Sequence, residues 1–231
     1  MVMNLLIIAA HPDDEVLGCG ASMAKWSSQG HQVHVLILAE GATSRSVVRS
    51  RQEHEEELSA LGKAAQKAGE ILGVASVTIM EFPDNRMDSI DRLEIVKAIE
   101  TVIQRCSPHT VVTHHAGDVN IDHRLIHEAV FTACRPQPSN PVKRLLAFEV
   151  PSSTEWTPSG SLPPFTPQHF EDVSKTLPLK LQALEAYNSE MRSWPHPRSI
   201  QAVEHLARWR GATVGCEAAE AYMVMRSVDR I

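Results

Sequence analysis

The stretch Asn4–Glu15, NLLIIAAHPDDE, decides the fold. Its first part, Asn4–Ala10, is a short apolar run that ends in a His-Pro pair, which is typical of a fully buried strand. After the polar turn, Val16–Ser28 is a predicted helix that Gly30 closes. A buried strand that passes through a polar turn into a helix is the first unit of an α/β fold.

The same alternation continues to about residue 150. Further strands are predicted at His31–Ala39, Ser76–Phe82, Thr110–Thr113 and Lys143–Val150. The helices predicted between them are an apolar stripe at Leu58–Leu72, a second stripe at Ile90–Ile103, and Asp122–Cys134. Because parallel strands need a crossover connection, the pattern predicts a three-layer Rossmann-like α/β fold with a mostly parallel sheet.

The texture of the sequence changes at Pro151. Ser152–Pro167 contains four prolines and is predicted to be an irregular loop. Two helical segments are predicted after it, Leu177–Arg192 and Ser199–Arg210. We therefore expect one domain over residues 1–231, with a sheet core at 1–150 and a C-terminal helical and loop cap at 151–231.

Composition narrows the class of protein. The 22 basic and 28 acidic side chains give a net charge of −6, which argues against a nucleic-acid partner. No apolar run approaches the ~18 residues of a membrane-spanning helix. A signal peptide begins with a positively charged segment, whereas no Lys or Arg precedes Lys25 in this sequence. The four cysteines are far apart and are expected to be free thiols. Together these features predict a soluble, cytoplasmic chain.

Two segments rich in His and Asp follow predicted strands. Ala10–Glu15 follows the first strand, and Thr113–His123 follows the strand at Thr110–Thr113. Ligands of open parallel sheets bind beyond the carboxyl ends of the strands, so these segments are expected to meet. Two histidines and one carboxylate, with a coordination position left for water, make a catalytic zinc site. A remaining carboxylate near that water would act as the general base.

His11-Pro12-Asp13-Asp14-Glu15 after an apolar strand, with Asp122-His123-Arg124 downstream, resembles the PIG-L/LmbE-like family of zinc-dependent de-N-acetylases. Ala219-Glu220-Ala221-Tyr222 resembles the closing motif of that family. The resemblance implies a metal-dependent amidohydrolase that removes the N-acetyl group from an N-acetylglucosamine-type saccharide or glycoconjugate. It also implies one zinc ion per chain and no further cofactor.

The resemblance assigns roles residue by residue. It implies His11, Asp14 and His123 as zinc ligands, with Asp13 as the general base for the metal-bound water that attacks the amide. It implies Asp122 as a carboxylate that orients its neighbours.

Asn120 stands where many members of the family carry a histidine. An amide can donate a hydrogen bond to the oxyanion, but it cannot deliver a proton. The proton for the leaving amine would then come from Asp13 itself, or from His114 or His115 in the same loop.

Several alternatives stay open at this point. A deformylase or amidase acting on a related N-acyl sugar or thiol conjugate fits the same motifs, as does a non-catalytic module that binds metal or sugar. The partner expected in each case is a small or glycan-linked N-acyl sugar, and a homo-oligomer is left open. Three loops would either line the site or only pack against the fold, namely Pro83–Asp88, Ser152–Trp156 and His196–Ser199.

Overall fold

The computed structural model describes residues 2–229. Its strands are β1 (Asn4–Ala9), β2 (Gln32–Ala39), β3 (Ser76–Phe82), β4 (Thr110–His114), β5 (Arg144–Phe148), β6 (His169–Asp172) and β7 (Ala219–Ser227). Its helices are α1 (Asp14–Ser28), α2 (Glu55–Leu72), α3 (Arg92–Cys106), α4 (Ile121–Ala133), α5 (Leu177–Ala186) and α6 (Ile200–Ala212). Three short 3₁₀ helices lie at Thr43–Arg45, Met87–Ser89 and Thr154–Trp156.

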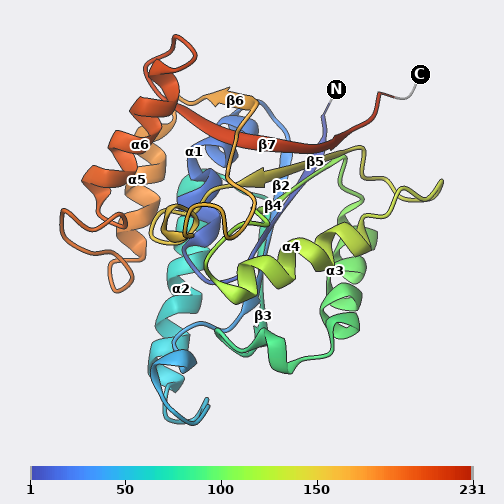
Figure 1. Cartoon of the computed structure of the whole chain (residues 1–231), viewed down its shortest axis with the longest axis vertical. Helices are drawn as coiled ribbons and strands as arrows, with labels where there is room; N and C mark the ends of the chain where they lie inside the picture. The colour runs from blue at the N-terminus through green and yellow to red at the C-terminus, as the bar shows by residue number, and fades with distance from the viewer. Residues whose placement is uncertain (1, 230–231) are drawn as a thin grey trace.

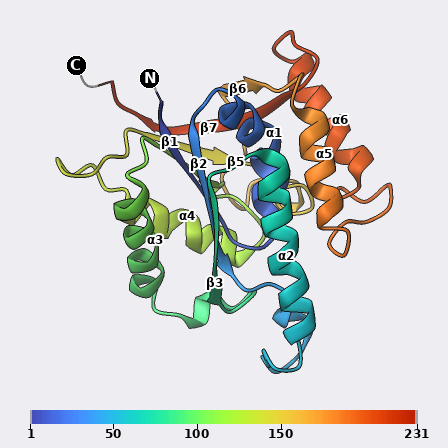
Figure 2. The ribbon, with the colours of Figure 1, turned by 180° about the vertical axis from the view of Figure 1, so that it is seen from behind.

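The seven strands form one sheet in the order β3-β2-β1-β4-β5-β7-β6. The first five strands pair in parallel, and β7 pairs antiparallel with both β5 and β6. Helices α3 and α4 cover one face, while α1, α2, α5 and α6 lie on the other (Figures 1 and 2). The predicted three-layer, Rossmann-like fold with a mostly parallel sheet is confirmed.

Two apolar cores separate the layers. One lies between the sheet and helices α1, α2, α5 and α6, and includes Val35, Ala68 and Leu184. The other lies under α3 and α4 and includes Leu36 and Ile99. Neighbouring residues of β2 belong to different cores because successive strand side chains point to opposite faces.

The C-terminal part differs from the helical and loop cap expected for residues 151–231. It contributes two strands, β6 and β7, to the far edge of the sheet, and its first helix ends at Ala186 instead of Arg192. The first four residues of β7 are all buried, so the segment lacks the alternation that marks a half-buried strand. No helix within the described residues is long and apolar enough to cross a lipid bilayer.

Helix α1 is broken at Cys19, where φ is −149°. The break removes the helical hydrogen bond between the carbonyl of Leu17 and the N–H of Ala21. Lys180 Nζ donates to the Leu17 carbonyl (2.8 Å), and Glu220 Oε1 accepts from the Ala21 N–H (3.1 Å). A helix break in the core is thus capped on both sides by charged groups.

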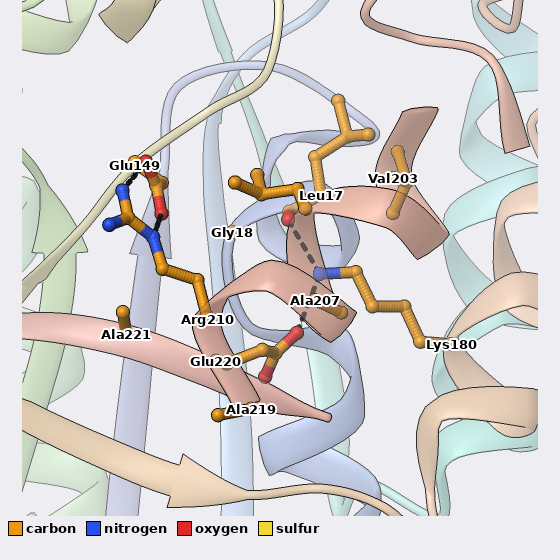
Figure 3. Close-up of a pocket in the computed structure, with 11 residues that line it drawn as sticks. Leu17, Gly18, Glu149, Lys180, Val203, Ala207, Arg210, Ala219, Glu220 and Ala221 are labelled. Atoms are coloured by element: carbon orange, nitrogen blue, oxygen red, sulfur yellow. Dashed lines mark hydrogen bonds and ion pairs between the residues drawn. The ribbon is translucent and has the colours of Figure 1, made fainter. Parts of the chain in front are cut away.

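Lys180 and Glu220 also pair with each other, with Nζ 2.6 Å from Oε1 (Figure 3). Glu220 Oε2 accepts from the N–H of Ser22 (2.7 Å) and the hydroxyl of Tyr222 (3.2 Å). The cavity beside this pair measures about 20 Å³, which has room for one water and not for a ligand. The motif at residues 219–222 therefore has a structural task, since it closes the break in the helix that carries Asp14.

Candidate metal centre

The candidate site lies at the carboxyl ends of β1, β3 and β4. His11–Glu15 covers the turn after β1 and the first residues of α1, and Asp84 follows β3. Asp118–His123 covers the end of the loop after β4 and the first residues of α4. Because these strands are neighbours or near neighbours in a parallel arrangement, their following segments meet at one edge of the sheet. The two loops that the sequence predicted to meet do meet.

The structure brings the three predicted ligands together. Asp14 Oδ2 lies 3.1 Å from His11 Nδ1 and 3.1 Å from His123 Nε2. One ligand atom from each of the three residues lies within 4.8 Å of the other two. Their spacing suits a shared metal ion, which three protein ligands and a water would coordinate.

The far nitrogen of each imidazole faces a second carboxylate. His11 Nε2 lies 3.2 Å from Asp122 Oδ2, and His123 Nδ1 lies 3.2 Å from Asp118 Oδ1. Histidine ligands of metals usually have their other ring N–H held in this way, which fixes the tautomer and turns the free lone pair toward the metal. Asp122 and Asp118 thus occupy equivalent places behind the two rings.

One buried atom supports a cation at this point. His123 Nε2 is buried and makes no hydrogen bond, although it faces Asp14. Buried polar atoms without a partner are rare and costly in folded proteins. The donor set of two imidazole nitrogens and one carboxylate oxygen fits Zn²⁺, so the residues present fit the implied metal.

The protonation states of the three predicted ligands depend on one another. Burial favours the neutral form of Asp14, but the adjacent imidazoles of His123 and His11 outweigh it and hold the pKa of Asp14 well below its usual range. Burial favours neutral His123 as well, yet the carboxylates of Asp14 and Asp118 raise its pKa to about 9. Burial also acts against the charged form of His11, and the carboxylates of Asp122 and Asp14 raise its pKa well above the usual value.

Asp13 has an unusual backbone for a non-glycine residue, with φ at 113°. Its N–H donates to Glu15 Oε2 (3.1 Å), and its carboxylate Oδ2 accepts from Arg198 Nη1 (3.0 Å). Burial raises the pKa of Asp13 well above its usual range, although the Arg198 guanidinium opposes the shift. Such strained residues persist where the surroundings hold them, and they gather at functional sites.

Glu15 supports this turn from the side of the core. Its Oε1 accepts a 2.6 Å hydrogen bond from the Tyr187 hydroxyl, which lies just beyond the end of α5. Burial raises the pKa of Glu15 to about 7, with the Tyr187 hydrogen bond acting in the opposite direction. Glu15 therefore ties the backbone of Asp13 to the C-terminal part of the chain.

Asn120 is the N-cap of α4. Its Oδ1 accepts from the N–H of Asp122 (2.9 Å), and its Nδ2 donates to Asn85 Oδ1 (2.8 Å). Asp122 in turn accepts from the backbone N–H groups of Asn85 (2.7 Å) and Met87 (3.0 Å). Both residues connect the loop after β4 to the loop after β3.

The other histidines of the loop are turned away from the site opening. His114 is fully buried, and its Nε2 accepts from the N–H of Ala10 (2.8 Å). Burial lowers the pKa of His114 well below its usual value. His115 Nε2 lies 2.9 Å from the carbonyl of Pro163. Both rings are therefore engaged by backbone groups of the protein.

A cavity of about 210 Å³ opens beside the predicted ligands. Its walls come from the loops after β1, β2, β3 and β4 and from the connection between α5 and α6. The polar groups among the lining residues are His11, Asp13, Ser44, Asp84, Asn85, Asn120, Glu190, Arg192 and Arg198. The cavity thus places Asp13 and Asn120 beside one of the two imidazoles.

The sequence alone does not decide whether several of these residues line the site. Asp84 lies 3.3 Å from His11 Nε2, so the loop at Pro83–Asp88 does line the site. The hydroxyls of Ser153 and Thr154 both donate to Asp118, and Arg198 reaches Asp13. The place of Asp84 after β3 was a usable signal, because the loops after parallel strands share one edge. No local pattern places Arg198.

The sequence is similar to a known family and to proteins named as deacetylases. The model of the PIG-L family, described as GlcNAc-PI de-N-acetylase, matches residues 6–134. The uncharacterized deacetylase YaiS of Escherichia coli is 31% identical over 192 residues, which cover 80% of this chain and 91% of YaiS. The diacetylchitobiose deacetylase of Thermococcus kodakarensis is 28% identical over 204 residues, covering 82% of this chain and 70% of that protein.

Solved structures confirm the fold, and they include an enzyme with a different activity. The 4-carboxy-2-hydroxymuconate hydratase GalB of Pseudomonas putida superimposes with a TM-score of 0.75 at 23% identity, over the full length of both chains. That likeness concerns the fold alone. With the match to the family model and to YaiS, the chain belongs to the PIG-L family, whose relatives named above are deacetylases. The predictions of the family and of an amidohydrolase enzyme are confirmed.

Proposed function

We propose that this member of the PIG-L family is a zinc-dependent hydrolase that removes the N-acetyl group from an N-acetylglucosamine-type saccharide or glycoconjugate. The name of the Thermococcus relative, a diacetylchitobiose deacetylase, supports this substrate class. The four free cysteines, Cys19, Cys106, Cys134 and Cys216, support a reducing compartment, and we place the reaction in the cytoplasm.

One observation carries the proposal. Two imidazoles face the same Asp14 oxygen, each with its far nitrogen against another carboxylate, and His123 Nε2 has no hydrogen-bond partner. We propose that His11, Asp14 and His123 hold one zinc ion. When bound, zinc would polarise the amide carbonyl and lower the pKa of a water to ~7.

Asp13 is the proposed general base. Its carboxylate is buried, lines the cavity and neighbours the ligand Asp14, so it would take a proton from the attacking water. The same carboxyl group would then give that proton to the leaving nitrogen. Neither His114 nor His115 lines the cavity, which leaves Asp13 as the better-placed proton carrier of the three candidates considered.

Asn120 is the proposed hydrogen-bond donor to the oxyanion. Its Nδ2 carries two hydrogens, one of which goes to Asn85, and the residue lines the cavity beside His11. Because its Oδ1 is fixed as the cap of α4, the amide is oriented before substrate arrives. Asp122 would act through His11 by holding Nε2 in place.

The cavity favours a small substrate unit. At about 210 Å³ it is smaller than the ~300–1,000 Å³ of sites for drug-sized ligands, so it suits one sugar residue, with any further group extending toward solvent. Its carboxylate, amide and hydroxyl groups are suited to hydrogen bonds with sugar hydroxyls.

The test is acyl release from a panel of N-acyl sugars by the zinc-reconstituted protein. We expect acetate from N-acetylglucosamine conjugates, with kcat lowered about 10²–10⁴-fold in Asp13→Asn. Formate or a longer acid as the main product would favour the deformylase or amidase alternative. Full zinc occupancy without any hydrolysis would favour the non-catalytic alternative. Because a hydratase shares the fold, the assay must identify the released acid itself.

A further inference from the structure

Arg198 lies in the connection between α5 and α6, more than 180 residues along the chain from the turn that it contacts. Its Nη1 donates to Asp13 Oδ2 (3.0 Å), and its Nε donates to Ser152 Oγ (2.8 Å). Among the residues that the structure describes, Arg198 is the one cation paired with Asp13. The contact joins the C-terminal part of the chain to the proposed base.

The backbone around Arg198 is fixed on both sides. Its own N–H donates to His196 Nδ1 (3.0 Å), and the next residue, Ser199, caps α6 by accepting from the N–H of Ala202 (3.0 Å). On the far side of the guanidinium, the N–H of Ser152 donates to Glu155 (2.6 Å). The guanidinium is therefore held in place before any substrate enters.

Asp13 needs such a partner. Its left-handed backbone is held by Glu15 at the N–H and by the N–H groups of Val16 and Leu17 at the carbonyl. None of these hydrogen bonds fixes the side-chain torsions. With Oδ2 bound to Arg198, the carboxylate is held in one orientation in the cavity. An error of about 1 Å in such a group can lower the rate about 100-fold.

We infer that Arg198 is a positioning residue, which fixes the carboxylate of Asp13 in the orientation that proton transfer requires. The inference rests on the proposed function, in which Asp13 is the base. It differs from a role in substrate binding, because Arg198 acts through Asp13 and not through contact with the sugar. A contact with substrate in the ground state would change KM, whereas an effect on the base changes kcat.

Kinetics of Arg198→Met and Arg198→Lys test the inference. For Arg198→Met we expect kcat to fall about 10–100-fold with KM within about threefold of the original. Arg198→Lys should recover part of kcat, and millimolar guanidinium should recover part of it in Arg198→Ala. Arg208→Met is the matched control, because this exposed arginine on α6 pairs only with Glu204 among the described residues. A raised KM with unchanged kcat would overturn the inference.

A crystal structure of zinc-loaded Arg198→Met gives a readout that needs no activity. We expect the Asp13 carboxylate to turn away or to occupy several rotamers, while His11, Asp14 and His123 superimpose and zinc content is unchanged. An Asp13 side chain that keeps its rotamer, or a loss of zinc, would overturn the inference. If the original protein releases no acyl group, the proposed function fails, and the rotamer of Asp13 still decides the role of Arg198.

Discussion

Two buried clusters of charge lie at the two ends of the same helix segment, and they are built on opposite principles. At the break in α1, Lys180 and Glu220 neutralise each other, and backbone groups and a hydroxyl complete their hydrogen bonding. At the start of α1, six buried carboxyl groups lie close to three imidazoles, those of His11, His114 and His123, and to the guanidinium of Arg198. They are Asp13, Asp14, Glu15, Asp84, Asp118 and Asp122.

The two clusters differ in the features that mark a functional site. The Lys180–Glu220 cluster has its charges matched and lies beside a cavity too small for a ligand. The cluster at the start of α1 has more carboxyl groups than cationic groups, a buried nitrogen without a hydrogen bond and an adjacent cavity. Burial of charge alone does not mark function. An imbalance of charge that a ligand would complete is the better sign.

The largest effect on the free energy of unfolding should come from Lys180→Met. The change leaves Glu220 buried without its cation, which typically costs ~3–5 kcal/mol of unfolding free energy. Urea unfolding of the metal-free proteins measures it, and Lys97→Met is the control, because its exposed pair with Glu100 should contribute less than ~1 kcal/mol. A loss below ~1 kcal/mol in Lys180→Met would mean that Glu220 does not depend on Lys180 for its charge balance.

Glu171→Gln tests a second ion pair, whose carboxylate lies on β6 beside Glu220. Glu171 lies opposite Glu220 in the sheet and pairs with Lys25 (2.6 Å) and His169 (2.9 Å). Burial would raise its pKa, but these partners lower it from 4.5 to about 2. A lowered folded-state pKa stabilises the fold above pH 4.5, and this contribution is lost as the pH falls toward 2.

We therefore expect Glu171→Gln to cost about 2 kcal/mol at neutral pH, after allowance for the partial exposure of both partners. The difference from the original protein should shrink steadily between pH 4.5 and pH 2. Unfolding curves over that pH range provide the measurement. A difference that does not change with pH would show that the ion pair is not its source.

The smallest expected effect is an increase in the free energy of unfolding. In the metal-free protein, Asp13→Asn should raise the unfolding free energy by about 1 kcal/mol at neutral pH, because it removes a buried charge beside the charge of Asp14. Arg198 keeps some contact with water and tolerates the loss. Asp88→Asn on the exposed 3₁₀ helix is the control. A clear loss of stability in Asp13→Asn would show that the charges at the candidate site are as well matched as those of the Lys180–Glu220 pair.

The sequence allows most of the parallel sheet to be predicted. The predicted strand at Ser76–Phe82 coincides with β3, and the other four predicted strands lie within a residue or two of those observed. Buried parallel strands and amphipathic helices have strong apolar patterns, which makes them visible without an alignment. The break at Cys19 was not predicted, because it depends on Lys180 and Glu220, which come from far along the chain.

The same division applies to the candidate site. His11, Asp14 and His123 follow strands whose order the topology implies, so their meeting could be predicted. Tyr187 and Arg198 could not be predicted, since they come from the part of the chain after β5, where short irregular segments set the geometry. The place of the cap relative to the sheet depends on β7, whose uniformly buried start has no clear strand pattern.

The closure of α1 by Glu220 has a consequence for synthesis on the ribosome. The N–H groups of Ala21 and Ser22 gain their carboxylate partner only after residue 220 has left the exit tunnel. Until then, the emerging chain carries a helix with an open polar break at its centre, next to the turn that holds Asp14. The proposed metal centre, whose residues come mostly from the first half of the polypeptide, is therefore expected to form late, when the last strand of the sheet docks.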